Sequence, residues 1–292
     1  MSNLLEIQFR SWRRNDRRAP HKPLLVVLAL ARLSEGQRWI SWNQVDEELS
    51  MLLSTFCHDP SPKPHYPFIR LQSDGIWVLQ KDEGLVYNSS GDASVKSLKE
   101  LNPEGGLTDE FIASCEKNAG SNWALLRIRE ILESEFPPSL HDEILAALNV
   151  DDSFSSVRIV RRSRSPEFRQ QVLDIYNGQC AICGFSGRLK GKLAGVEAAH
   201  IKWHAYGGPD EIRNGLALCS LHHKLFDLGA LGLSDQLTVL VSPSFSGERT
   251  RPMVLDYEGK EIFIPRQRSV ATDPEPAYVR WQRSEVYQDW GG

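Results

Sequence analysis

The sequence predicts an α+β protein built from two domains. The chain has 292 residues, which suits two domains that each bury a core of their own. The first half shows helical periodicity followed by a hairpin signal, and the second half carries cysteines and histidines at metal-ligand spacing. We expect one domain at residues 1–150, a linker at 151–164 and a second domain at 165–292.

The first domain is predicted to resemble a winged helix. Pro23 marks the start of a leucine-rich helix, because proline is favoured in the first helical turn. The sequence Ser41-Trp42-Asn43-Gln44 has the pattern of a capping box and opens a second amphipathic helix. The turn residues Ser73-Asp74-Gly75 separate two apolar runs, 68–71 and 76–79, as in a hairpin. Two helices followed by a hairpin indicate a winged-helix-like unit.

The total charge does not indicate nucleic-acid binding, but the distribution of arginines allows it. The net charge is −4 and the pI is about 6.1, whereas nucleic-acid-binding domains are usually basic. A local basic face can hold phosphates even when the whole chain is acidic. The arginines cluster at two places: Arg10, Arg13, Arg14, Arg17 and Arg18 near the start, and Arg158, Arg161, Arg162, Arg164 and Arg169 in the middle.

Membrane association and export are not indicated. The longest apolar run, Leu24 to Leu30, is far too short to span a bilayer. The N-terminus lacks the charged and then apolar pattern of a signal peptide. The 5 cysteines, an odd and sparse number, argue against a disulfide framework, and the metal-like pattern of three of them fits a reducing compartment. We therefore expect a cytoplasmic protein without membrane contact.

The second domain carries two pairs of potential zinc ligands. Cys180-Ala181-Ile182-Cys183 is one half of a zinc knuckle, and Cys219-Ser220-Leu221-His222 supplies the other half. Two ligands separated by two residues can hold one tetrahedral Zn²⁺ from a tight turn, and two such pairs complete its coordination. The pairs are farther apart than in a short zinc finger. We therefore expect this structural zinc to hold the two ends of an inserted segment.

The inserted segment resembles the HNH nuclease family. It contains Glu197-Ala198-Ala199-His200-Ile201, then Gly207-Gly208-Pro209, then Asn214, and then His222-His223. In that family a strand carries a histidine followed by isoleucine, a loop carries an asparagine, and a helix carries a histidine. One branch brackets this module with a zinc site. The resemblance covers about residues 165–230 and implies a ββα-metal nuclease fold.

The resemblance assigns three catalytic residues, and their chemistry suits phosphodiester hydrolysis. His200 can deprotonate water, because an imidazole titrates near neutral pH. His223 can bind a catalytic Mg²⁺, Mn²⁺ or Co²⁺ ion as a neutral nitrogen ligand. In the family, the residue at Asn214 holds the loop and the base-bearing strand in register or supports the metal.

One position departs from the family pattern. Many members carry Asp or His directly before the base as a metal ligand, whereas this sequence has Ala199. Glu197 could replace that ligand directly or through water. His222 and His223 point about 100° apart on a helix, so they should not serve one metal. His222 lies three residues after Cys219 and is the zinc candidate, which leaves His223 for the catalytic ion.

The first domain resembles the sulfur-binding domain of phosphorothioate-dependent, McrA-type restriction endonucleases over about residues 5–100. The resemblance lies in Arg17-Arg18-Ala19-Pro20-His21-Lys22-Pro23-Leu24-Leu25, in Tyr66-Pro67-Phe68-Ile69-Arg70-Leu71 and in Gly75-Ile76-Trp77. It implies that Tyr66 and Pro67 contact the sulfur, which is larger, softer and less hydrated than oxygen. The residues expected to hold phosphates and reach base edges are Arg17, Arg18, His21 and Lys22. A later basic residue also contributes in the family, and either Lys96 or Lys99 could stand there.

Together the two resemblances imply a type IV-like restriction endonuclease that reads phosphorothioate-modified double-stranded DNA and hydrolyses the backbone nearby. Because double-strand cutting by a one-site nuclease needs two copies, we expect a homodimer. Two alternatives stay open. One is an HNH nuclease directed to methylated or hydroxymethylated DNA, whose readers flip a base into an aromatic-lined pocket. The other is a zinc-stabilised DNA-binding regulator without catalysis, which the missing acidic residue at Ala199 would favour.

Overall fold

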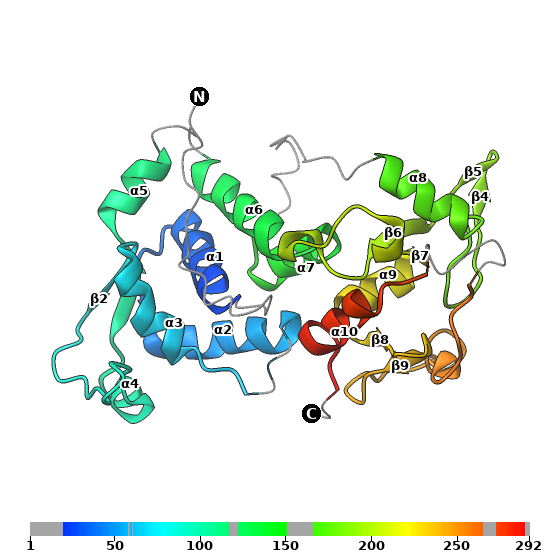
Figure 1. The fold of residues 1–292 in the computed structure, drawn as a ribbon. Coiled ribbons are helices and arrows are strands. Elements are labelled where there is room, and N and C mark those ends of the chain that lie inside the picture. Colours follow the sequence, from blue (N-terminus) through cyan, green and yellow to red (C-terminus); the bar gives the residue numbers. More distant parts are fainter. Residues whose placement is uncertain are drawn as a thin grey trace. The chain divides into compact units, whose positions relative to one another are not determined.

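The computed structural model forms two compact units, each with its own core (Figure 1). Unit 1 comprises Met1–Glu135 and His141–Ile159, and unit 2 comprises Phe136–Leu140 and Val160–Gly292. Helices and strands occur in both, which confirms the predicted α+β class. The predicted domain boundaries stay a prediction, and the predicted linker at 151–164 lies outside the described residues. The structure describes residues 20–57, 59, 61–116, 122–150, 166–264 and 273–289.

Unit 1 is organised around one apolar helix, α1, which is buried along most of its length. A helix that is apolar on every side must be enclosed by other elements. α1 packs against α2, α3 and α6, and Figure 1 shows α2 and α6 beside it. The elements of this unit are α1 (His21–Ser34), β1 (Ile40–Ser41), α2 (Trp42–Phe56), α3 (His65–Arg70), η1 (Leu71–Asp74), β2 (Trp77–Gln80), α4 (Val95–Leu101), β3 (Glu104–Leu107), α5 (Asp109–Glu116), α6 (Trp123–Glu135) and α7 (Pro138–Ala147), whose first residues belong to unit 2.

Within the described residues of unit 1, three strands form an antiparallel sheet in the order β1-β3-β2. The central strand β3 carries Gly105, where a Cβ atom would lie 2.9 Å from the Phe68 ring and closer still to Trp77. Phe68 packs edge-on between Trp42 and Trp77, with ring centroids 5.2 Å and 6.0 Å apart. The glycine therefore lets this aromatic cluster approach the sheet backbone closely.

The predicted hairpin between residues 68–71 and 76–79 is wrong. Phe68 lies in α3 and Leu71 begins η1, so the first of the two runs is helical. Both side chains are fully buried, and residues three apart share one face of a helix. The second run contributes β2, which pairs with β3 rather than with a neighbouring strand across a tight turn. In the chain, α4 lies between β2 and β3, so these two strands are not joined by a tight turn. The winged-helix-like topology stays a prediction.

The start of α2 follows the predicted helix-capping pattern. The Ser41 hydroxyl accepts a hydrogen bond from the backbone N–H of Gln44 at 3.4 Å. This bond satisfies one of the N–H groups that the first helical turn leaves without a partner.

Among the described helices of the chain, none is long and apolar enough to cross a membrane.

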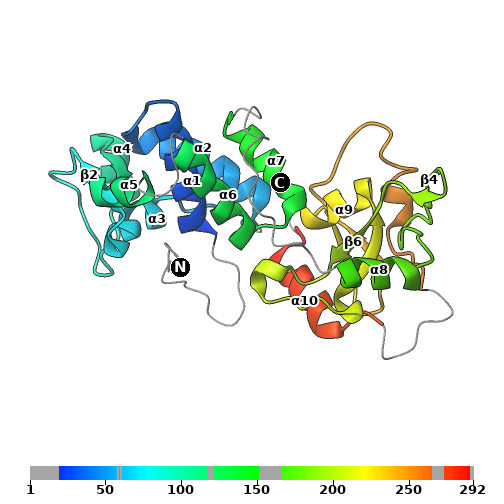
Figure 2. The ribbon, with the colours of Figure 1, turned by 90° about the horizontal axis from the view of Figure 1, so that it is seen from above.

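Unit 2 contains the predicted ββα arrangement. Strands β6 and β7 pair antiparallel, with Val196 opposite Cys219 and His200 opposite Gly215, and α9 follows β7 directly. α8 packs on both strands, and Figure 2 shows it beside β6. The elements are α8 (Pro166–Ile175), β4 (Arg188–Leu189), β5 (Lys192–Leu193), β6 (Val196–His200), η4 (His204–Tyr206), η5 (Ile212–Asn214), β7 (Gly215–Cys219), α9 (Ser220–Asp227), β8 (Leu231–Leu233), β9 (Val239–Val241), η6 (Leu255–Tyr257) and α10 (Pro276–Glu285).

The last elements of the chain close the core of unit 2. β8 and β9 form a further antiparallel pair, and β8 packs against α9 and α10. The fully buried Gln282 of α10 donates from its side-chain amide to the Leu231 carbonyl at 3.0 Å. The C-terminal segment therefore supports the helix that carries His222 and His223.

Candidate functional site

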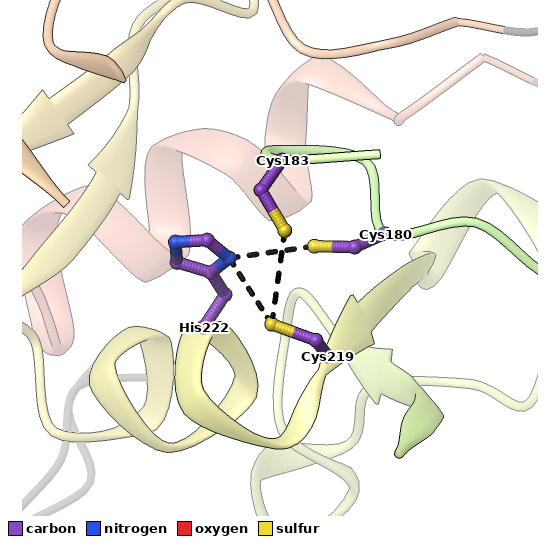
Figure 3. Close-up of side chains that lie close together, drawn as sticks. All are labelled: Cys180, Cys183, Cys219 and His222. Carbon is purple, nitrogen blue, oxygen red and sulfur yellow. Dashed lines mark hydrogen bonds between the residues drawn. The ribbon is translucent and has the colours of Figure 1, made fainter. Parts of the chain in front are cut away.

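The four predicted zinc ligands lie together in unit 2 (Figure 3). Their ligand atoms all lie within 4.8 Å of one another. The imidazole Nδ1 of His222 is 3.4 Å from the Cys180 sulfur and 3.2 Å from the Cys219 sulfur, and the sulfurs of Cys183 and Cys219 are 3.9 Å apart. Zn–S bonds of about 2.3 Å at tetrahedral angles give edges of about 3.8 Å. The donor set and its size therefore fit one tetrahedral zinc ion.

Local geometry aims these four side chains at one point. The Cys180 N–H donates to the Phe185 carbonyl at 2.9 Å, and the left-handed Gly184, with φ of 72°, completes the turn that carries both cysteines of the first pair. Cys219 ends β7 and serves as the N-cap of α9. One turn later, His222 donates from Nε2 to the Met253 carbonyl at 2.9 Å, which leaves Nδ1 to face the sulfurs.

The cysteines of the cluster influence one another's pKa values. A hydrogen bond from the Cys219 thiol lowers the pKa of Cys180 to about 3. The same bond raises the pKa of Cys219, and burial raises the pKa of Cys183. A bound divalent cation would hold all of these cysteines as thiolates.

His200, the predicted base, is held on one face and at one edge. It ends β6 and is 8% exposed. Its ring stacks on Phe168 of α8, with centroids 4.2 Å apart and an angle of 17° between the planes. Its Nε2 lies 2.7 Å from Oδ1 of Asp210, a residue that sequence reasoning did not single out. The side chain of Asp210 lies in the loop between β6 and β7.

Asn214 fixes that loop from inside. Its side-chain oxygen accepts from the Lys202 N–H at 2.8 Å, and its amide nitrogen donates to the carbonyls of Lys202 at 2.9 Å and Pro209 at 3.0 Å. The side chain is fully buried. Gly208 lies against it, where a Cβ atom would come within 2.8 Å of the Asn214 amide nitrogen. The three bonds tie both ends of the loop together, while a part for Asn214 in catalysis stays a prediction.

His223 lies between two carboxylates on opposite edges of its ring. Nδ1 is 2.7 Å from Glu197 Oε2, and Nε2 is 3.2 Å from Asp227 Oδ2. Burial lowers the pKa of His223, but Asp227 and Glu197 outweigh it and raise the pKa to about 9. Asp227 is itself held, because the Trp203 indole N–H donates to it at 3.1 Å and the Ser139 hydroxyl donates to it as well. Asp227 was also missed from the sequence.

The two adjacent histidines therefore face different groups. His222 faces the cysteine cluster, whereas His223 contacts the carboxylates of Glu197 and Asp227. Glu197 can reach His223 from β6 because side chains alternate along a strand, so that positions 197 and 199 share one face. Because of this alternation, the carboxylate of Glu197 reaches the side of the strand on which the family pattern has a metal ligand and this chain has Ala199. The spacing of Asp227, four residues after His223 on α9, was the signal available for the second carboxylate.

Of the residues predicted to hold DNA phosphates, the structure describes His21 and Lys22. Arg17 and Arg18 lie outside the described residues. His21 Nε2 is 3.1 Å from an Asp59 oxygen, and its side chain is 35% exposed. Lys22 is 2.6 Å from Asp74, with only 11% and 8% of the two side chains exposed. Lys22 therefore has a charge partner inside unit 1, and its contact with DNA stays a prediction.

Tyr66 and Pro67, the predicted sulfur contacts, lie in α3 rather than in an open loop. The Arg70 guanidinium lies over the Tyr66 ring at 4.4 Å, and the His65 ring is 4.2 Å away on centroids. Arg70 also donates two hydrogen bonds of 2.6 Å to the carboxylate of Asp92, whose side chain is 5% exposed. This bidentate pair lowers the pKa of Asp92 and fixes the cation above the tyrosine.

Of the two candidates for a later basic contact, Lys96 is the more open. The Lys96 side chain is 84% exposed and its ammonium lies 3.8 Å from Glu100, whereas the Lys99 side chain is 59% exposed and its ammonium lies 3.5 Å from Asp46. Both pairs are exposed enough for a phosphate to compete with the carboxylate.

Two family profiles match the chain. The ScoMcrA-like DNA sulfur-binding domain matches residues 4–153, more than half of the 292 residues. The HNH endonuclease domain matches residues 180–234 and covers the zinc cluster, His200, Asn214 and His223. No curated protein matches the chain.

Several solved structures resemble unit-sized parts of the chain. The sulfur-binding domain of ScoMcrA, complexed with phosphorothioated DNA, is 20% identical at a TM-score of 0.42, with 49% of this chain and 91% of that chain covered. The type IV phosphorothioation-dependent restriction endonuclease ScoMcrA is 20% identical at a TM-score of 0.37. The match covers 47% of this chain and 27% of that chain, so it spans about a quarter of that protein. The modification-dependent TagI restriction endonuclease is 26% identical at a TM-score of 0.31, and the match covers 41% of this chain and 38% of that chain.

The cluster predicts a zinc-dependent fold for unit 2. Elemental analysis of the purified chain should find about one zinc ion per molecule, held by four ligands. Cys183→Ser should lose that ion and lower the Tm by about 5 °C or more, because binding energy at a structural zinc is folding energy. Cys57→Ala, at a buried cysteine of unit 1, should keep the zinc. A wild-type chain without zinc, or a full zinc complement in Cys183→Ser, would contradict the assignment.

Proposed function

Because this chain belongs to the ScoMcrA-like DNA sulfur-binding domain family and carries an HNH endonuclease domain, we propose that it is a type IV-like restriction endonuclease. Residues 1–150 recognise a phosphorothioate linkage in double-stranded DNA, and residues 165–292 hydrolyse phosphodiester bonds nearby. The observation that carries the proposal is the presence of both matches in one chain, with His200 and His223 inside the matched nuclease segment.

In this proposal His200 is the general base. Its Nδ1 accepts a proton from a water molecule, and the water oxygen attacks phosphorus while the bond to the leaving sugar oxygen breaks. The leaving oxygen takes up a proton from solvent, which balances the step. His200 suits this work because its Nε2 faces a carboxylate and its ring is held by Phe168. Asn214 keeps the adjoining loop in place through its three hydrogen bonds.

Glu197 and His223 are the residues that would hold the catalytic divalent ion. Their oxygen and nitrogen donors suit Mg²⁺, Mn²⁺ or Co²⁺. The Glu197 side chain is 46% exposed and the Asp227 side chain 2%, so the Glu197 edge of the imidazole is the one that an ion from solvent can reach. Asp227 then orients His223 from the buried edge. When bound, the ion supplies positive charge against the charge that develops on the phosphate.

The zinc cluster has a structural part in this proposal. Zn²⁺ held by Cys180, Cys183, Cys219 and His222 would fix the start of α9 against β6 and the first cysteine turn. Because each chain offers one such nuclease site, cutting both strands calls for two copies, and a homodimer is the assembly we propose.

The surface of α3 supplies the sulfur contact in this proposal. Sulfur in a phosphorothioate is less hydrated than oxygen, so it gains from an apolar neighbour beside a cation. Tyr66 is half-buried and presents its ring under the Arg70 guanidinium, which provides both features at one place. Family membership favours this sulfur target over methylated or hydroxymethylated bases, and the HNH match favours a nuclease over a regulator.

Substitution of either proposed catalytic histidine should slow cutting strongly but keep DNA binding. With phosphorothioate-containing plasmid and Mn²⁺, His200→Ala and His223→Ala should lower the cleavage rate by about 10²- to 10⁴-fold, because each removes a group that acts on the reacting phosphate. His141→Gln, in unit 1, is the matched control and should cut like the wild type. Equal cleavage by wild type and His200→Ala, with both proteins folded by circular dichroism, would refute the assignment of the base.

Removal of the Tyr66 ring should reduce discrimination for sulfur. In full-length protein, Tyr66→Ala should weaken binding to a phosphorothioate duplex by about 10- to 100-fold, because a buried aromatic contact contributes about 1.5–3 kcal/mol. Binding to the unmodified duplex should change little. Tyr87→Ala, at a tyrosine of the same unit that is 47% exposed, is the control. A Tyr66→Ala protein that still prefers the phosphorothioate duplex as strongly as wild type would exclude this contact.

A further inference from the structure

We propose that Asp210 is the positioning residue of the catalytic base, because it selects the His200 tautomer whose Nδ1 can accept a proton. The inference rests on the proposed role of His200 as the base. Asp210 does not belong to the pattern of His200, Asn214 and His223 on which the nuclease resemblance depends. It comes from the geometry of the loop between β6 and β7 alone.

The contact fixes which ring nitrogen carries the proton. Nε2 of His200 lies 2.7 Å from Oδ1 of Asp210, which is the length of a charge-assisted hydrogen bond. An ionised carboxylate only accepts, so Nε2 must carry the hydrogen and donate it. In a neutral imidazole the other nitrogen, Nδ1, then holds the lone pair that can take a proton from water.

A second restraint fixes the plane of the ring. Phe168 stacks on the face of His200 at 4.2 Å, and α8, which carries Phe168, packs on β6. Stacking alone would allow the imidazole to flip by 180° about its Cβ–Cγ bond, which would put Cε1 in the place of Nε2 and Cδ2 in the place of Nδ1. The carboxylate at the edge removes that freedom, because only one of the two orientations places Nε2–H against Asp210.

The loop holds Asp210 in place through its neighbour. The Asn214 amide donates to the carbonyl of Pro209, the residue directly before Asp210, at 3.0 Å. On the other side, the Asn214 N–H donates to the carbonyl of Glu211 at 2.9 Å. The backbone on both sides of Asp210 is therefore anchored to the same buried asparagine. This arrangement connects Asn214 with the base through the backbone of the loop.

The same carboxylate serves the proton transfer. When His200 takes a proton, the ring becomes an imidazolium, and an adjacent carboxylate stabilises that charge. The other two carboxylates of the site, Glu197 and Asp227, are engaged with His223. Asp210, with Oδ1 2.7 Å from Nε2 of His200, is placed to provide that carboxylate.

Two measurements on the full-length chain test the inference. The first is the ring-nitrogen NMR spectrum, with the His200 signals identified by their loss in His200→Ala. Wild type should show a protonated Nε2 and an unprotonated Nδ1, and Asp210→Ala should show a mixture of tautomers. The second is cleavage of phosphorothioate plasmid at saturating Mn²⁺. Asp210→Ala should lower kcat by about 10- to 100-fold with KM for DNA and the half-saturating Mn²⁺ concentration unchanged.

Further variants separate positioning from other roles. Asp210→Asn offers both an accepting oxygen and a donating amide, so it should no longer select one tautomer and should lose activity as Asp210→Ala does. In the His200→Ala background, Asp210→Ala should cost nothing more, because it acts through the ring that is already gone. Asp235→Asn, which breaks a 2.9 Å pair with Arg283 elsewhere in unit 2, should cut like wild type.

Four results would overturn the inference. They are a wild-type His200 protonated on Nδ1, an Asp210→Ala protein that cuts like wild type while His200→Ala does not, an additive loss in the double variant, and a raised Mn²⁺ requirement, which would make Asp210 a metal ligand. If wild type and His200→Ala cut equally, the proposed function fails instead. In that case the tautomer of His200 still decides whether Asp210 orients the ring.

Discussion

Cys219 joins the two halves of the site, because it ends β7, begins α9 and belongs to the four-ligand cluster. The register places it opposite Val196, at the start of the strand that ends in His200. Its cluster partner His222 lies one helical turn further along α9. A cation bound there would fix the direction in which the helix leaves the strands. That direction turns the next residue, His223, toward Glu197 and Asp227.

His200 and His223, the two catalytic candidates, have the same side chain but are suited to different roles by the carboxylates beside them. His223 has a carboxylate at each nitrogen, which raises its pKa to about 9 and makes it a place where a divalent ion can replace a proton. His200 has a carboxylate at Nε2 and an aromatic ring on its face, which suits a group that must take up a proton at one defined atom. The difference arises from the neighbours and not from the imidazoles.

The four residues predicted as zinc ligands lie together in the structure, and they come from two pairs that are close in sequence. Cys180 with Cys183 and Cys219 with His222 are each separated by two residues, so a turn or a helix start brings them together without knowledge of the fold. Asp210 carries no such signal, because its partner lies ten residues away across an irregular loop. The pairing of Lys22 with Asp74 joins segments 52 residues apart, and the supposed hairpin failed because a short apolar run fits a helix as well as a strand.

The dependence of the nuclease unit on its cation is tested most directly by hydrogen–deuterium exchange of the full chain before and after zinc is extracted with a chelator. Backbone amides of β6, β7 and α9 should lose protection when the ion is removed, while the buried helix α1 of unit 1 should keep it. Unchanged protection of α9 and β7 after verified removal of the metal would contradict the view that the cluster holds this site together.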